Sequence, residues 1–130
     1  MREASPGDRL EAGQALVAPG GFHLTFNENG QAALNQHPPV HGVRPAIDVT
    51  MASLVQRFGE ALVGVVLTGM GSDGAQGAQI IRGAGGYVIA EDESSCVVWG
   101  MPRCVAEAGA ANVIAPLPDI PAAIRMALRS

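Results

Sequence analysis

The stretch VVLTGMGSDGAQG, Val65 to Gly77, carries the clearest signal of the fold class in this chain. It begins in an apolar run that predicts a β-strand at about Leu62–Leu67. The run lacks polar alternation, which indicates that both faces of the strand are covered, as in a parallel sheet. It then breaks into a loop with several glycines and one acidic residue, Asp73. A helix is expected from Gly74 to about Gly83, so strand, loop and helix in this order predict an α/β fold.

The sequence on both sides of this stretch continues the α/β pattern. Apolar residues upstream recur at i, i+3, i+4 and i+7, which predicts one buried face of a helix, and Asp48 is expected to cap that helix. Downstream, a buried strand, a short helix, a last short strand and an amphipathic helix are expected. The residues behind these predictions are Met51, Leu54, Val55 and Phe58 for the first helix, Ile80 and Ile81 for the helix after the loop, then Gly86–Ala90, Met101–Ala110, Ala111–Leu117 and Pro118–Ser130, with Ile120, Ile124 and Leu128 on one stripe.

Residues 1–45 have a different character. Short strands are expected at Gln14–Pro19, Phe22–Phe26 and Ala32–Asn35. Turns are expected between them, at Gly20-Gly21 and at NENG, because Asn and Gly accept positive φ at low cost. These features predict a small antiparallel hairpin or ribbon, followed by a proline-rich connection that leads into the α/β part at residue 46.

The expected fold class is therefore α/β and doubly wound, a three-layer αβα (Rossmann-like) arrangement with a mostly parallel sheet. The 130 residues fit one domain or part of one. Strand Leu62–Leu67 is expected to be central in the sheet. Only about three doubly covered strands can be found, fewer than the roughly five or six of a typical sheet, so the sheet is predicted to be incomplete.

Composition excludes several classes of function. The net charge is −4 and the 8 Lys and Arg residues are scattered, so no nucleic-acid partner is predicted. No apolar stretch is long enough for membrane insertion, and the polar N-terminus has no signal-peptide core. Cys96 and Cys104 are expected to be free, buried thiols in a cytoplasmic protein. No cofactor is predicted. No metal is predicted either, because the two prolines between His37 and His41 prevent the helix that would bring these histidines together as metal ligands.

The glycine loop permits a phosphate-binding interpretation. Gly69, Gly71 and Gly74 fit the G-x-G-x-x-G spacing of dinucleotide-binding loops. The acids of AEDE, Ala90–Glu93, follow the next strand, where a ribose-binding acid would lie. The chemistry of a phosphate site thus has two sequence features in its favour.

Electrostatics favours a loop that presents a carboxylate. Asp73 is expected at the N-terminus of the helix that follows it, where a pyrophosphate would need the same free N–H groups. Two anions competing for one set of donors repel each other, whereas the helix dipole stabilises a single ionised carboxylate. A plain helix cap at Asp73 is the other interpretation that the residues leave open, since such caps are common.

The combination LTGMGSDGAQG and AEDESSCVVWGMPR, with APGGFHL and PPVHGVRPAIDV upstream, resembles the catalytic domain of the chemotaxis protein-glutamate methylesterases, the CheB-type response regulators. The resemblance implies a Ser-His-Asp triad that hydrolyses methyl esters of glutamate on chemoreceptor helices and deamidates certain glutamines. It assigns the triad acid to Asp73, which would orient the histidine. It also places Met70 beside the nucleophile, with a backbone N–H suited to an oxyanion.

The nucleophile and base that the resemblance implies are not found in these 130 residues. There is no Ser-Thr-Gly-Gly turn, and none of His23, His37 and His41 matches the catalytic histidine, although His23 is a candidate for lining the cleft. The chain is therefore interpreted as the C-terminal part of one methylesterase domain, without a receiver domain, inactive alone and prone to self-association through an exposed sheet edge. The alternatives are a non-catalytic receptor-binding module and a dinucleotide-binding domain.

Overall fold

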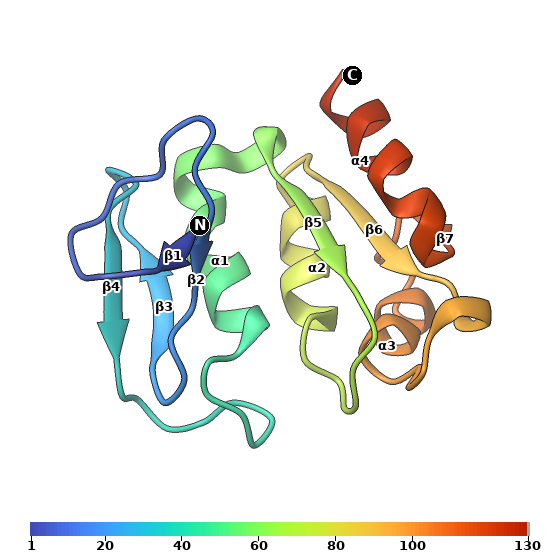
Figure 1. Ribbon diagram of the computed structural model, residues 1–130, viewed down its shortest axis with the longest axis horizontal. Helices are drawn as coiled ribbons and strands as arrows, with labels where there is room; N and C mark the ends of the chain where they lie inside the picture. Colours follow the sequence, from blue (N-terminus) through green and yellow to red (C-terminus); the bar gives the residue numbers. More distant parts are fainter. Residues whose placement is uncertain (130) are drawn as a thin grey trace.

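A parallel three-stranded sheet forms the centre of the α/β part of the chain (Figure 1). The computed structural model describes residues 1–129, and all statements about its structure concern these residues. The strand order is β5–β6–β7, and the helices are α1, α2, α3 and α4. Their bounds are Val63–Val66 for β5, Tyr87–Glu91 for β6, Val113–Ala115 for β7, Ile47–Phe58 for α1, Ala75–Gly83 for α2, Met101–Glu107 for α3 and Ile120–Leu128 for α4.

Helices cover both faces of this sheet. Neighbouring residues of a strand point to opposite faces, and β6 shows the consequence. Val88 and Ala90 lie in the core beneath α1, α2 and α3, whereas Ile89 packs with Ala115 and Ile120 in the core beneath α4. All three β6 residues are fully buried. The predicted α/β fold with a parallel sheet covered on both sides is confirmed.

The position of β5 in the sheet differs from the prediction. The strand expected to be central pairs, within residues 1–129, with β6 alone, so it lies at the sheet edge and β6 is the central strand. The apolar character of β5 comes from packing on both faces and carries no information about its neighbours. This sheet is small, as the count of doubly covered strands predicted.

The N-terminal part holds two pairs of short strands. β3 (His23–Phe26) and β4 (Ala32–Asn35) form the expected antiparallel hairpin around the NENG turn. The first expected strand shortens to β2 (Leu16–Val17), and its predicted antiparallel pairing is wrong, because it pairs in parallel with β1 (Arg2–Glu3). Helix α1 packs against β3 on one side and α2 on the other, so it joins the two parts (Figure 1).

Three short 3₁₀ helices complete the described structure: η1 (Gly59–Ala61), η2 (Glu93–Ser95) and η3 (Leu117–Asp119). Two expectations for buried side chains need correction. Ile81 is buried in α2, but Ile80 is exposed, and Leu128 of α4 is exposed although Ile120 on the same stripe is buried. None of the helices within residues 1–129 combines the length and apolar character needed to cross a membrane.

Candidate active site

Two loops meet at the carboxyl end of the sheet, which is where α/β proteins place ligands and chemistry. One loop follows β5 and carries GMGSDG, and the other follows β6. Gly69 donates through its N–H to Val98 O (3.2 Å), and its carbonyl accepts from the N–H groups of Gly100 (3.1 Å) and Met101 (2.9 Å). A Cβ at Gly100 would lie 2.7 Å from Gly69 O, so only glycine allows this approach. The two loops thus form one unit.

Asp73 is buried and its carboxylate is held by the N-terminus of α1. Its Oδ2 accepts from the N–H of Ile47 (2.6 Å) and its Oδ1 from the N–H of Asp48 (3.0 Å). These donors belong to the first turn of α1, so Asp73 caps that helix from a distant loop. Asp48 was expected to cap α1 and does not, because the helix already begins at Ile47 and the N-cap position is Ala46.

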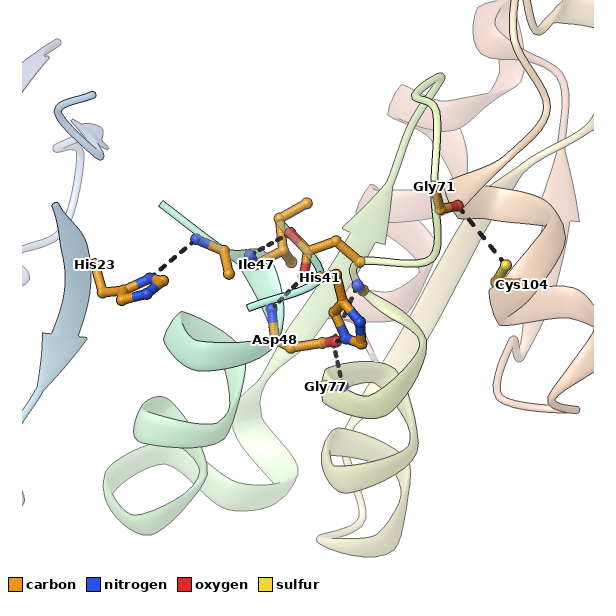
Figure 2. A network of polar contacts seen from close by, with 10 residues as sticks. His23, His41, Ile47, Asp48, Gly71, Gly77 and Cys104 are labelled. Carbon is orange, nitrogen blue, oxygen red and sulfur yellow. Dashed lines mark hydrogen bonds and ion pairs between the residues drawn. The ribbon is translucent and has the colours of Figure 1, made fainter. Parts of the chain in front are cut away.

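Asp48 instead caps α2. Its Oδ1 accepts from the N–H groups of Gly74 (3.0 Å) and Gly77 (2.7 Å), and its Oδ2 lies 3.0 Å from His41 Nε2 (Figure 2). Asp73 directly precedes the N-cap of α2, as expected, but its carboxylate binds the N–H groups of α1 and not those of α2. The carboxylate of Asp48 takes the donors that a pyrophosphate would require, so the phosphate-binding interpretation of Gly69, Gly71 and Gly74 fails.

A cavity of about 260 Å³ opens beside Asp73. Its lining consists of His41, Val43, Pro45, Ile47, Met70, Gly71, Ser72, Asp73 and Met101. The Met70 side chain is 84% exposed, and its N–H makes no hydrogen bond to residues 1–129. A larger cavity, about 340 Å³, is lined by residues such as Leu10 and Val63 and lies at the amino end of β5, opposite these loops.

The site can present an ionised carboxylate to a hydrogen-bond donor entering this cavity. Each Asp73 oxygen accepts one backbone N–H, and a carboxylate oxygen has two lone-pair sites. One acceptor position per oxygen therefore remains for another donor, such as an imidazole N–H.

Glu91, at the end of β6, holds the start of the loop after β5 by a hydrogen bond from Thr68. Its side chain is buried; Oε1 accepts from the Thr68 N–H (2.7 Å) and Oε2 from the Ser95 hydroxyl (2.8 Å). Burial alone would raise the pKa of Glu91, but the hydrogen bonds from Thr68 and Ser95 outweigh it and hold the pKa below its ordinary value. The AEDE acid considered for ribose binding is thus a structural carboxylate, a role that the sequence pattern did not indicate.

A lowered pKa makes Glu91 a source of pH-dependent stability. Because the unfolded chain binds the proton more tightly, the contribution of Glu91 is present above the ordinary glutamate pKa, about 4.3, and is lost as pH falls through the lower folded value. Glu91→Gln is expected to flatten the fall of the unfolding free energy at acidic pH. Urea unfolding from pH 6 down to pH 3 measures this. A slope equal to that of Glu28→Gln, at an exposed turn, would contradict it.

His23, Cys96 and Cys104 lie outside the lining of the cavity beside Asp73. His23 is buried, with Nδ1 accepting from Ala46 N–H (3.3 Å), so its Nε2–H donates to Pro38 O (3.0 Å). It does not line the cavity, which corrects that expectation. Cys96 and Cys104 are free thiols as predicted, but half-buried and not buried. Among residues 1–129 no group of three or more His, Cys, Asp or Glu side chains could hold a metal ion.

The family profile described as CheB methylesterase matches residues 1–124. The chain belongs to the CheB methylesterase family. The catalytic domain of CheB methylesterase from Thermotoga maritima, a solved structure, superposes with a TM-score of 0.89 at 39% identity, covering 94% of this chain and 66% of that domain. The recognised resemblance and the fold class are thereby confirmed.

Full-length relatives of this CheB methylesterase chain share high identity with it. The protein-glutamate methylesterase/protein-glutamine glutaminase of Symbiobacterium thermophilum is 56% identical over 128 residues. The protein-glutamate methylesterase/protein-glutamine glutaminase 2 of Pseudomonas aeruginosa is 49% identical over 127 residues. The alignments cover 98% and 95% of this chain but only 35% and 36% of the relatives. The chain thus spans about a third of the length of these relatives.

Proposed function

We propose that this chain supplies the acid of a Ser-His-Asp triad in a protein-glutamate methylesterase, which hydrolyses glutamate methyl esters on chemoreceptors and deamidates certain glutamines. The observation that carries the proposal is the buried Asp73 carboxylate, fixed by the α1 N-terminus beside a cavity at the carboxyl end of β5. The names of the relatives supply the reaction.

In this proposal the serine and the histidine come from a part of the domain outside these 130 residues. Asp73 accepts a hydrogen bond from the imidazole, holds one tautomer and stays ionised throughout. The serine oxygen attacks the ester carbonyl as the histidine takes its proton, and methanol then leaves with that proton. Water hydrolyses the acyl-enzyme by the same steps, leaving a glutamate carboxylate. With a glutamine substrate, ammonia leaves in place of methanol.

The β5 loop is proposed to serve the substrate side of this reaction. Met70 lines the cavity and its N–H makes no hydrogen bond within residues 1–129, so this N–H is a candidate donor to the oxyanion of the tetrahedral intermediate. Gly71 adopts φ +98° and Gly74 φ +106°, values that side chains rarely adopt, and Gly69 holds the neighbouring loop. The partner is proposed to be a chemoreceptor helix, in the cytoplasm.

Methanol release from methylated chemoreceptor tests the proposed function. The chain is compared with an extended domain, in which it follows the upstream sequence that carries the serine turn and the histidine. We expect release by the extended domain and none by the 130-residue chain. Release by the chain alone would show a nucleophile elsewhere in it. An extended domain that binds methylated receptor and releases no methanol would replace the esterase with a receptor-binding module.

A further inference from the structure

We propose that Asp48, supported by His41, is a positioning residue that fixes the place of the catalytic acid Asp73; the inference rests on the proposed function. Asp48 is not among the residues that line the cavity beside Asp73. The Asp48 side chain acts on Asp73 through Gly74, the next residue in the chain, whose N–H donates to Asp48 Oδ1.

The two buried carboxylates cap each other's helices. Asp73 precedes α2 and binds the N–H groups of α1, whereas Asp48 lies in α1 and binds the N–H groups of α2. The N-cap of α2 is Gly74, which has no side chain to offer, so Asp48 supplies the cap that this helix lacks locally. Gly74 follows Asp73 directly, so the hydrogen bond from the Gly74 N–H to Asp48 fixes the position of the Asp73 backbone.

His41 holds the second oxygen of Asp48. Residues Val40 and Val43 exchange both backbone hydrogen bonds (3.0 Å each), and the residues between them, His41 and Gly42, have φ of +55° and +76°. This is the pattern of a type I′ turn, which requires positive φ at both central residues; histidine is among the residues with a side chain that adopt positive φ more often than most. The turn points the imidazole at Asp48, with His41 Nε2 at 3.0 Å from Asp48 Oδ2 (Figure 2).

Removing Asp48 leaves buried N–H groups at the start of α2 without an acceptor. The loop then gains freedom, and small displacements of a catalytic group cost large factors in rate. We expect Asp48→Ala in the extended domain to lower kcat for methanol release about 10- to 100-fold, with KM changed less than about threefold. Asp48→Asn keeps an oxygen for Gly74 and Gly77 and an amide for His41, so it should restore most of kcat.

The experiment measures kcat and KM of the extended domain, and amide hydrogen exchange at Gly74 and Gly77. Ser53→Ala is the matched control, because Ser53 Oγ accepts from Phe26 N–H (3.0 Å) on another side of α1. Faster exchange and a kcat loss at least tenfold beyond the control, both restored in Asp48→Asn, support the proposal. A kcat for Asp48→Ala equal to that of Ser53→Ala overturns it.

His41→Asn keeps the inference testable if Asp48→Ala fails to fold. Asparagine accepts the positive φ of the turn but does not reach Asp48 as the imidazole does. A kcat lowered about three- to tenfold at an unchanged unfolding midpoint supports the proposal, and an unchanged kcat overturns it. If Asp73→Asn leaves methanol release intact, the proposed triad has failed, and that result is separate from any outcome at Asp48.

Discussion

Asp73→Asn in the extended domain lowers kcat for methanol release by about 10⁴-fold, the size of effect that loss of the acid has in Ser-His-Asp triads. The asparagine amide no longer selects the correct imidazole tautomer and no longer stabilises the imidazolium. Its oxygen still accepts one of the two α1 N–H groups, so the loss of stability should stay near about 1–2 kcal/mol. Steady-state kinetics and urea unfolding measure the two effects separately.

The matched control for this prediction is Glu93→Gln. Glu93 is an exposed acid in the neighbouring loop, and its replacement removes the same charge from the same end of the sheet. We expect kcat within about twofold of the parent, because an exposed charge at this distance is screened by solvent and salt. Equal losses of kcat in Asp73→Asn and Glu93→Gln would mean that Asp73 acts only through its negative charge and not through a hydrogen bond to the histidine.

Gly77→Ala destabilises the chain by about 2 kcal/mol, although alanine is the better helix former. The new Cβ would lie 2.8 Å from both Cβ and Sδ of Met51 and 3.2 Å from Asp48 Oδ1. Cβ of Met51 is fixed by the α1 backbone, so the two helices must move apart, which also strains the Asp48 cap on α2. Urea unfolding of the 130-residue chain gives the change in free energy.

Gly83→Ala serves as the opposite case in the same helix. A Cβ at Gly83 would meet nothing within 4 Å, so only the helix propensity changes. We expect a gain of up to about 1 kcal/mol. Both variants replace a glycine of α2 by alanine, and their stability changes are expected to have opposite signs. The difference between them measures the effect of the close approach of α1 and α2. A Gly77→Ala variant as stable as Gly83→Ala would contradict the described packing.

The strands and helices of the α/β part could be predicted because their signals are local. The apolar run before Gly69 and the periodic apolar residues of α1 report burial directly. The place of β5 in the sheet could not be predicted in the same way, since a strand covered on both faces reads alike at the edge and in the centre. The parallel pairing of β1 with β2 rests on two residues in each strand and leaves no pattern to detect.

The sequence singled out the loop of the candidate site but not the contacts that its residues make. Asp73 was singled out from the GMGSDG loop, yet its cap partners lie 26 residues away in sequence at Ile47. Rules for capping look within three residues of a helix start, so they assigned Asp48 and Asp73 each to the wrong helix. His41 was missed because its role depends on a turn that brings it to Asp48. A His-Gly pair between two valines was the available signal.

If Asp73 holds the catalytic imidazole, a crystal structure of the extended domain will show that contact. We expect an imidazole nitrogen within about 2.6–3.2 Å of one Asp73 oxygen, while both oxygens keep their bonds to the first turn of α1. The serine oxygen should lie on the other side of that imidazole. A structure with no imidazole nitrogen within hydrogen-bond distance of either Asp73 oxygen would show that Asp73 is a helix cap alone and not a triad acid.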